Sequence, residues 1–388
     1  MTTTKNNEHK KLNVPNIRFP EFEGEWENCS LSEICTFHNG RAYKQIELLP
    51  KGKYRVLRVG NFFTNDSWYY SNLELEDNKY AQNGDLLYAW SASFGPRFWK
   101  EEKVIYHYHI WKIDSLKNVD KEFLYHFLDL DSAKIKNEVQ GGTMVHITKG
   151  DMERRSISYP SIREQRKVAK LLSFLDERIA TQTKIIEDLK KLKSAIIEIE
   201  YTPKTNSISH LGDVIEQISK RNKNYAIQNV LSVSNRQGFI KQSDQFENRS
   251  VASEDTSNYK IVEFNNFAFN PARINVGSIA RLTTFKKGIV SPMYICFRTK
   301  EGVAPEYIDY FFESKHFYSE IQKRLEGSVR QCLSYEGLCN IPLSLPSHEM
   351  QKRIGKRLFT LGQKIKLETD LLDLLNEQKQ YLLRQMFI

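Results

Sequence analysis

The chain has 388 residues, of which 40% are hydrophobic and 12% aromatic, and it carries a formal net charge of +9. This length exceeds the usual size of one hydrophobic core, and the aromatic content excludes a wholly disordered chain. The sequence has no run of 18 apolar residues and no signal peptide, so we expect a cytoplasmic protein without membrane spans, and the basic balance favours a polyanionic partner.

A first globular block is predicted over residues 16–159, after a polar and flexible tail at residues 1–15. Alternating apolar residues predict strands at Tyr54–Phe63 and Lys103–Ile113, and a helix is predicted at Lys121–Val139. A Gly-led segment and a short apolar strand, SISYP, close the block.

A long helix is predicted over residues 160–203, after the helix-start residues Pro160 and Ser161. Its apolar residues recur at steps of four and three, which is typical of a coiled-coil seam. The seam residues are Val168, Leu172, Leu175, Ile179, Ile186, Leu189 and Ile196.

A second block over residues 204–345 repeats the order of elements of the first block. Strands are predicted at Ile227–Asn235 and Gly288–Thr299, and a helix at Pro305–Leu325. A Gly-led segment and a short strand, PLSLP, again precede a long helix, here over residues 346–388. The two blocks otherwise differ in sequence, so we expect similar scaffolds with different surfaces.

The two long helices are copies of one another, offset by 186 residues, with 10 of 38 aligned positions identical. Both copies interrupt the apolar seam at matching positions, Gln182 with Glu368 and Lys193 with Lys379. The first helix leads into the second block and the second helix leads back, so a paired rod would be antiparallel and about 54 Å long at ~1.5 Å per residue. The alternative is two ordinary amphipathic helices on separate domains.

These patterns predict an α+β fold. Two globular mixed α/β domains are separated by an antiparallel coiled coil of two long helices, with a pseudo-two-fold internal repeat. Five cysteines without a C-x-x-C pair indicate free thiols in a reducing compartment.

The sequence offers no catalytic apparatus. The string nearest to the N/D-P-P-Y/F/W clamp of an adenine methyltransferase is Asn270-Pro271-Ala272-Arg273, which lacks the second Pro and the aromatic residue, and no phosphate-binding P-loop is present. His107 and His109 form an H-x-H pair, but their aromatic neighbours favour packing over metal binding. We therefore predict no enzyme activity, no cofactor and no metal.

Binding chemistry is better supplied, because duplex DNA is read by planar donors and acceptors and is held by cationic and hydroxyl groups. Loops of both blocks carry such side chains. In the first block the candidates are Arg41, Tyr43, Lys44, Ser91, Ser93, Arg97, Gln140, Thr143, His146 and Lys149. In the second block they are Arg221, Lys223, Asn235, Arg236, Arg273, Asn275, Arg281, Arg330, Gln331 and Ser334. The alternative for each residue is a solvated loop or a structural turn.

Apolar residues outside the seam are more than a two-helix rod can bury, so we expect partner helices to cover them. These residues are Leu171, Phe174, Ile185, Leu371 and Leu374.

Two segments carry a resemblance to a known family. PNIRFPEFEGEWENCSLSEI (Pro15–Ile34) and PSIREQRKVAKLLSFLDERI (Pro160–Ile179), the latter with its second copy, resemble the specificity subunits of type I restriction-modification systems. The resemblance implies that the blocks are target recognition domains, that the chain has no catalysis of its own, and that it docks two methyltransferase subunits. A larger complex would add restriction and translocase subunits.

The resemblance and the repeat together predict a DNA reader with a bipartite, asymmetric target. Each block would read one half, and the helices would set a gap of about one duplex turn, ~34–36 Å. Two rivals remain at this stage: a coiled-coil scaffold that binds proteins without DNA, and a stand-alone enzyme such as a fused methyltransferase.

Overall fold

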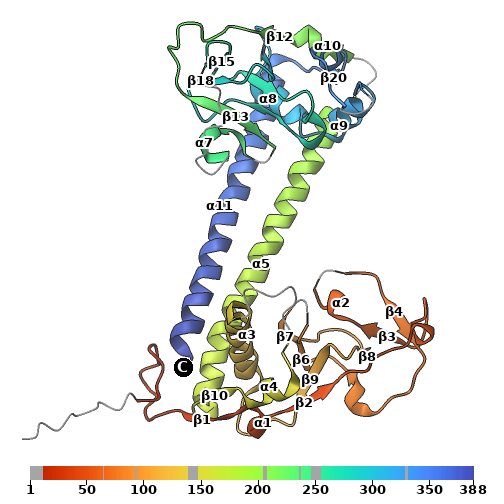
Figure 1. The fold of residues 1–388 in the computed structure, drawn as a ribbon, viewed down its shortest axis with the longest axis vertical. Coiled ribbons are helices and arrows are strands. Elements are labelled where there is room, and N and C mark those ends of the chain that lie inside the picture. The colour runs from red at the N-terminus through yellow and green to blue at the C-terminus, as the bar shows by residue number, and fades with distance from the viewer. Residues whose placement is uncertain are drawn as a thin grey trace, which may run out of the picture. The chain divides into compact units, whose positions relative to one another are not determined.

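The computed structural model of the chain describes residues 12–63, 65–91, 94–138, 147–203, 208–235, 237–245, 255–327 and 331–388. The chain forms two compact units (Figure 1). Unit 1 comprises Met1–Gln182 with Leu371–Ile388, and unit 2 comprises Thr183–Asp370. Each unit therefore holds one sheet-containing block together with part of each long helix, α5 (Ile162–Tyr201) and α11 (His348–Met386). The five-part division drawn from the sequence stays a prediction.

The strands in the described part of unit 1 form one antiparallel pair and two four-stranded sheets. The pair joins β1 (Glu27–Ser30) to β10 (Ser156–Tyr159). The first sheet has the order β2 (Thr36–Asn39), β9 (Ile110–Asp114), β6 (Leu86–Ala89), β7 (Gly95–Phe98). The second has the order β4 (Tyr69–Ser71), β3 (Tyr54–Leu57), β8 (Val104–Tyr106), β5 (Tyr80–Ala81), in which β3 and β8 run parallel.

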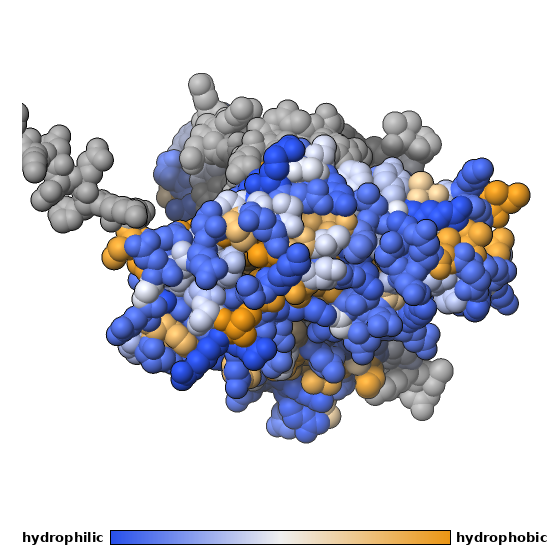
Figure 2. Space-filling view, turned by 90° about the horizontal axis from the view of Figure 1, so that it is seen from below, coloured by the Kyte–Doolittle hydropathy of each residue, from blue (hydrophilic) through white to orange (hydrophobic). Residues whose placement is uncertain are grey.

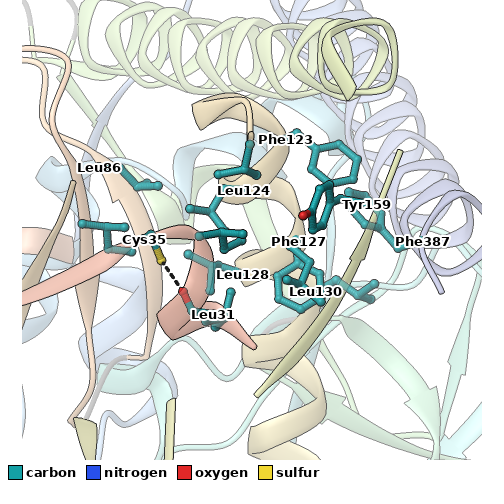
Figure 3. Packing of buried hydrophobic residues seen from close by; sticks show 14 of the residues in the cluster. Leu31, Cys35, Leu86, Phe123, Leu124, Phe127, Leu128, Leu130, Tyr159 and Phe387 are labelled. Atoms are coloured by element: carbon teal, nitrogen blue, oxygen red, sulfur yellow. Dashed lines mark hydrogen bonds between the residues drawn. The ribbon is translucent and has the colours of Figure 1, made fainter. Parts of the chain in front are cut away.

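The core of unit 1 lies where α3 (Lys121–Glu138) packs between the first sheet and the long helices. Figure 3 shows Phe123, Phe127 and Leu128 of α3 packed with Leu31 and with Phe387 beyond the end of α11. Apolar residues at α3 positions three and four apart thus face one cluster, as in an amphipathic helix. The helices of this unit, besides α5 and α11, are α1 (Leu31–Ile34), α2 (Val59–Phe63), α3 (Lys121–Glu138) and α4 (Lys149–Arg154), with 3-10 turns η1 (Gln45–Glu47) and η2 (Asp77–Lys79).

Unit 2 repeats this topology strand for strand. The pair joins β11 (Ile208–His210) to β20 (Pro342–Ser344). The first sheet has the order β12 (Ile215–Ile218), β19 (Ile295–Thr299), β16 (Phe267–Phe269), β17 (Ile279–Arg281). The second has the order β14 (Gly238–Lys241), β13 (Val230–Ser234), β18 (Lys287–Val290), β15 (Lys260–Glu263), and β13 and β18 are again parallel.

The core of unit 2 is tied together by two buried tyrosines. The hydroxyl of Tyr201, the last residue of α5, donates to the Tyr307 carbonyl (2.6 Å), and the Tyr307 hydroxyl donates to the Ser344 carbonyl (2.7 Å). These bonds join the end of the long helix to α8 (Pro305–Phe311) and β20. The remaining helices are α6 (Leu211–Val214), α7 (Gln242–Gln245), α8 (Pro305–Phe311), α9 (Lys315–Gln322) and α10 (Tyr335–Cys339), with the 3-10 turn η3 (Ile274–Val276).

The predicted antiparallel pairing of the long helices is confirmed in each unit separately. In unit 1 the start of α5, with Val168 and Leu172, shares a buried cluster with Leu383 near the end of α11. In unit 2 the end of α5, with Ile196, shares a cluster with Ile354 near the start of α11. In both cases the beginning of one helix lies beside the end of the other.

One repeated residue anchors each long helix to its block. The Gln165 side chain is fully buried, accepts from the Asp120 backbone N–H (2.7 Å) and donates to the Asn118 and Pro160 carbonyls. Its copy, Gln351, accepts from the backbone N–H of Ala304 (2.9 Å) and donates to the Pro346 carbonyl. The identical Gln in the two copies therefore holds the loop that starts each block's helix.

The matching lysines of the seam also have matching roles. Lys379 of α11 pairs with Asp129 of α3 (2.9 Å) and with Asp176 of α5 (2.7 Å) in unit 1. Lys193 of α5 pairs with Glu313 (2.6 Å), just after α8, in unit 2. Each lysine thus links the last part of its long helix to the globular block beside it. Polar residues in a helix seam fix the register of the paired helices in this way.

Several predicted elements are shorter or broken. The single strands predicted at Lys103–Ile113 and Gly288–Thr299 are each two strands, joined by the β8–β9 and β18–β19 turns. The predicted strand Tyr54–Phe63 stops at Leu57 and continues as α2. The helix predicted at Pro305–Leu325 breaks before α9, because Ser314 caps that helix by accepting from the Phe317 N–H (3.1 Å).

No helix in the described ranges is both long and apolar enough to cross a bilayer.

Candidate nucleic-acid interface

The parallel strand pair of each unit brings three loops to one edge of the second sheet. Strands β3 and β8 of unit 1 end at paired residues, Leu57 and Tyr106, whereas β18 of unit 2 ends at Val290, opposite Leu231, and β13 continues in the same direction to Ser234. The segment after the first strand and the turn after the second therefore emerge at the same edge, and the β6–β7 or β16–β17 loop joins them. We call this place the carboxyl edge of each unit.

At the carboxyl edge of unit 1 the β8–β9 turn, His107–His109, is the centre. The His107 N–H donates to the carbonyl of Leu57, the last residue of β3 (2.9 Å). From the β6–β7 loop, the Trp90 N–H donates to the His109 carbonyl (3.1 Å), and the Trp90 Nε1 to the Tyr108 carbonyl (2.8 Å). These bonds fix the turn, in which Tyr108 is 38% exposed.

The predicted residues Arg41 and Tyr43 join this turn. Arg41 forms a parallel bridge with His107, and its guanidinium pairs with Glu47 (2.7 Å). The Tyr43 ring stacks on His107 with centroids 6.4 Å apart, and burial raises the pKa of its hydroxyl, which therefore stays protonated. Arg41 is thus partly neutralised by Glu47, and Tyr43 serves mainly to support the turn.

His107 is a neutral imidazole at physiological pH. Burial, followed by the charges of His109 and Arg58, lowers its pKa to about 4. A neutral imidazole carries one donor and one acceptor nitrogen, a combination that suits a base edge better than a phosphate. Arg58, which follows β3, is a residue that the sequence analysis missed, and His107–His109 contains neither Gly nor Pro to signal a turn.

The other predicted residues of unit 1 have varied surroundings. Lys44 is exposed, whereas Ser91 is buried beside Trp90 in the β6–β7 loop. Arg97 is exposed on β7, and its guanidinium stacks 4.6 Å from the Phe63 ring of α2. Lys149 begins α4 and pairs with Glu153 (3.4 Å). Ser93, Gln140, Thr143 and His146 lie outside the described residues.

At the carboxyl edge of unit 2 the β16–β17 loop meets the end of β13. The Ser278 hydroxyl donates to the Val233 carbonyl (3.2 Å), and Gly277, with φ +88°, lies against Asn235. The Leu333 N–H donates to the Pro271 carbonyl (3.0 Å), which brings the segment after residue 330 to the same loop. Asn235, Arg273, Asn275 and Gln331, all predicted from the sequence, therefore belong to three segments that meet here.

Arg273 combines a fixed backbone with an uncommitted side chain. Its carbonyl accepts from the N–H groups of Val276 (3.2 Å) and Ser278 (3.1 Å), which holds the turn of η3. Its side chain is exposed and makes no hydrogen bond or ion pair with another described residue. Asn275 beside it is half-buried, while Asn235 and Gln331 are exposed. This arrangement offers a guanidinium and several amides to a ligand.

Two predicted residues of unit 2 have structural roles instead. The Arg281 guanidinium is 9% exposed and pairs with Glu306 (2.8 Å) and Asp309 (3.0 Å) of α8. Ser334 is half-buried and caps α10 by accepting from the Gly337 N–H (3.0 Å). Both side chains are committed within the unit, so neither is kept as a base contact. Arg236 and Arg330 lie outside the described residues, and Arg221 and Lys223 line a separate hollow.

Most of the predicted partner-binding residues of the rod are exposed. The exposed fractions are 53% for Phe174, 39% for Ile185, 38% for Leu371 and 62% for Leu374. Leu171 differs, because it is half-buried and packs against the core of unit 1. In unit 1 an open hollow of about 430 Å³ lies beside Phe174 and Leu375. The rod thus retains apolar surface of the kind that partners cover.

The buried thiols of both units are unsuited to nucleophilic chemistry. Burial raises the pKa values of the Cys35 and Cys296 thiols to about 12, so neither is a thiolate nucleophile at neutral pH. The described residues include no group of three or more His, Cys, Asp or Glu side chains placed to hold a metal ion. The face seen in Figure 2 is mostly hydrophilic, with apolar residues in small groups.

Comparison with known families and curated proteins identifies relatives over most of the chain. Residues 23–191 and 203–377 each match the family described as type I restriction modification DNA specificity domain. The MjaVIII type I restriction enzyme specificity subunit of Methanocaldococcus jannaschii is 24% identical over 320 residues, covering 74% of this chain and 74% of its own. The EcoBI specificity subunit of Escherichia coli is 23% identical over 184 residues, which cover 46% of this chain and 39% of its own.

Solved structures share the fold. The crystal structure of a type I restriction-modification system S subunit from M. genitalium aligns with 97% of this chain and 99% of its own, with a TM-score of 0.63 at 16% identity. A second structure, from a study of complex assembly in the type I restriction-modification system, covers 92% of this chain and 96% of its own at a TM-score of 0.51 and 14% identity. With two family matches over most of its length and the same repeated architecture, this chain belongs to the family of type I restriction-modification DNA specificity subunits.

Proposed function

We propose that each unit reads one half of an asymmetric, bipartite DNA target through its carboxyl edge. The observation that carries this proposal is that two units of identical topology display different side chains at the same edge. Unit 1 offers the turn His107–His109, and unit 2 offers Arg273 with Asn235 and Asn275. Equivalent scaffolds with unlike surfaces suit two unlike half-sites.

The side chains at each carboxyl edge suit contacts with different DNA bases. An arginine can donate two hydrogen bonds to the O6 and N7 of guanine, and an asparagine can pair with the N6 and N7 of adenine. Unit 2 offers both residue types in one loop. Unit 1 offers a neutral imidazole at His107 and the exposed Tyr108, which favour single hydrogen bonds and apolar contact with a thymine methyl group.

We further propose that the rod docks two methyltransferase subunits and sets the gap between half-sites, and that the chain itself is not catalytic. The exposed apolar residues Phe174, Ile185, Leu371 and Leu374 support docking. The pseudo-two-fold repeat supports a pair of equivalent partners, because each helix copy repeats the same seam. A larger complex would add restriction and translocase subunits, and the methyl donor would bind to the partners.

Separate reading of the two half-sites by the two units is tested by exchanging residues 205–345 for the corresponding segment of another family member. We expect the hybrid, with its methyltransferase subunits, to keep one half of its DNA target and to change the other half. The physical reason is that each edge is built within its own unit. Methylation of a randomised DNA library is the measurement, and a hybrid in which both halves change would contradict separate reading.

A point variant tests the edge of unit 2. Arg273→Ala should lower affinity by about 1–3 kcal/mol at one base pair of the second half-site and leave the other positions unchanged. Competition binding with single-base variants of the target measures this effect. Arg298→Ala is the matched control, because this arginine of β19 is 58% exposed and pairs with Glu216. An equal loss on every sequence would instead assign Arg273 to a phosphate contact.

A further inference from the structure

Unit 2 has a cationic hollow of about 720 Å³ beside its second sheet. The segment after β12 lines it with Lys220, Arg221 and Lys223, and β18 adds Lys287 from the sheet. Its apolar floor includes Ile261 of β15. Four cations thus surround one concave surface, a composition that suits a polyanionic ligand.

The corresponding face of unit 1 is filled by aromatic and aliphatic side chains. There, Val56 of β3 and Ile105 of β8 are covered by Tyr43, Tyr54 and Tyr69, with Leu48 and Leu75. In unit 2 the equivalent strand residues, Val230 and Ile289, are covered chiefly by Ile227 and Tyr259. The smaller cover leaves the hollow open, so the two units differ at the same place on the same scaffold.

The carboxylate of Glu263 faces the cations of the hollow and feels the charges of both Lys287 and Lys220. Lys287 pairs with Glu263 (2.8 Å), and this contact lowers the pKa of the Glu263 carboxyl, which stays ionised. Arg221 donates one hydrogen bond to the neutral Asn258 amide (2.9 Å). The ammonium groups of Lys220 and Lys223 make no hydrogen bond or ion pair with any other described residue.

One end of the hollow lies level with the last residue of β18. Arg221 forms a β-bridge with Lys260, whose backbone pairs with Val290, the last residue of β18. From there the hollow extends across the sheet face to Lys287 near the other end of that strand. A duplex read at the carboxyl edge would therefore have its flanking backbone within the field of these cations.

We propose that this hollow binds phosphates of the duplex that flank the half-site read by unit 2, an inference that rests on the proposed DNA-reading function. Lysine ammonium groups on flexible stems suit phosphates as point charges, and they lack the planar geometry that discriminates bases. Unit 2 then supplies sequence-independent affinity that the filled face of unit 1 does not match. The hollow holds the register of the duplex, and the carboxyl edge selects the sequence.

The test uses the full chain with its methyltransferase subunits, bound to target and scrambled duplexes across a salt series. Lys220→Gln with Lys223→Gln should weaken binding to both duplexes by the same factor. The slope of log affinity against log salt should shrink by about 1.8, since each phosphate contact contributes ~0.9. Lys220→Arg with Lys223→Arg should retain the slope. Lys315→Gln with Lys352→Gln removes the same charge from exposed sites on α9 and α11 and should change the slope little.

Several outcomes would overturn the inference. An unchanged slope, a slope change equal to that of the control, or a loss at one base position would each exclude phosphate binding in the hollow. Saturable binding of inorganic phosphate to the wild type, abolished in the Gln variant, would assign the hollow to a free phosphoryl ligand instead. If the wild type does not prefer its own target, the proposed DNA-reading function itself fails, whatever the variants do.

Discussion

Replacing Lys379 with methionine should loosen the end of α11 from unit 1. The Lys379 side chain is 12% exposed and is the shared partner of Asp129 and Asp176, which are 32% and 30% exposed. Removing one member of a buried ion pair costs about 3–5 kcal/mol, because the remaining charge stays poorly solvated. The partial exposure of both carboxylates lowers the expected loss here to about 2–4 kcal/mol.

The neighbouring imidazole gives Asp129 and Asp176 no substitute for this lysine. His126 lies near Asp176 (Nδ1 to Oδ2, 3.9 Å), but burial lowers the pKa of that imidazole to about 3, so it stays neutral. Amide hydrogen exchange in residues 371–386 and the urea midpoint measure the effect. Lys364→Met on the same helix is the control, since this exposed lysine forms an i,i+4 pair that contributes ~0.5 kcal/mol. Equal protection of α11 in both variants would refute the anchoring role.

Replacing Arg281 with methionine should destabilise unit 2 by about 2–4 kcal/mol. The guanidinium is nearly buried and donates to Glu306, Asp309 and the side chain of Asn265. Without it, the carboxylates of Glu306 and Asp309, which are 38% and 31% exposed, lose their shared cation, and their partial access to water keeps the cost below that of a fully buried ion pair. Hydrogen exchange of α8 and the urea midpoint report the loss.

The same variant separates a structural role from a reading role. We expect the Arg281→Met complex, when folded at lower temperature, to prefer the same DNA target as the wild type. Arg298→Met in the exposed pair with Glu216 should cost under ~1 kcal/mol. A stable Arg281→Met protein with altered preference at one base would restore this arginine as a base contact.

The repeated helices could be predicted from the sequence because their signal is local and periodic. The seam of apolar residues, the shared Pro-Ser start and the matching lysines all lie within the two copies. The order of the chain then dictated antiparallel pairing. The sequence could not reveal which block residues pair with the polar residues that interrupt the seam. Asp129, for example, lies 250 positions from its partner Lys379.

The strand errors have a common cause. The β8–β9 turn, His107–His109, contains neither Gly nor Pro, and its alternation of His and Tyr continues the pattern of a strand. In Gly288–Thr299 the Ser-Pro pair at the β18–β19 turn is a turn signal, and a single strand through it is the wrong prediction. The segment Val59–Phe63 forms a short helix, and the apolar residues at its end did not distinguish it from a strand in the sequence.

The candidate site was predicted in part. Arg273 and Asn235 were predicted from their loop positions alone, because basic and amide side chains in turns can contact DNA. Loop position could not separate them from Arg281, whose partners, Glu306 and Asp309, come from a helix more than twenty residues away. Nor could it reveal the parallel strand pairs, which are long-range pairings that decide which loops share an edge.

The most direct test of the central claim is a map of methylated adenines in cells that carry this chain and its methyltransferase subunits. Two unlike readers on a repeated scaffold predict a single asymmetric target, with two short unlike halves, a fixed unread gap and one methylated adenine in each half. A palindromic target, an uninterrupted target, or a methylation pattern that persists when this chain is deleted would contradict the account.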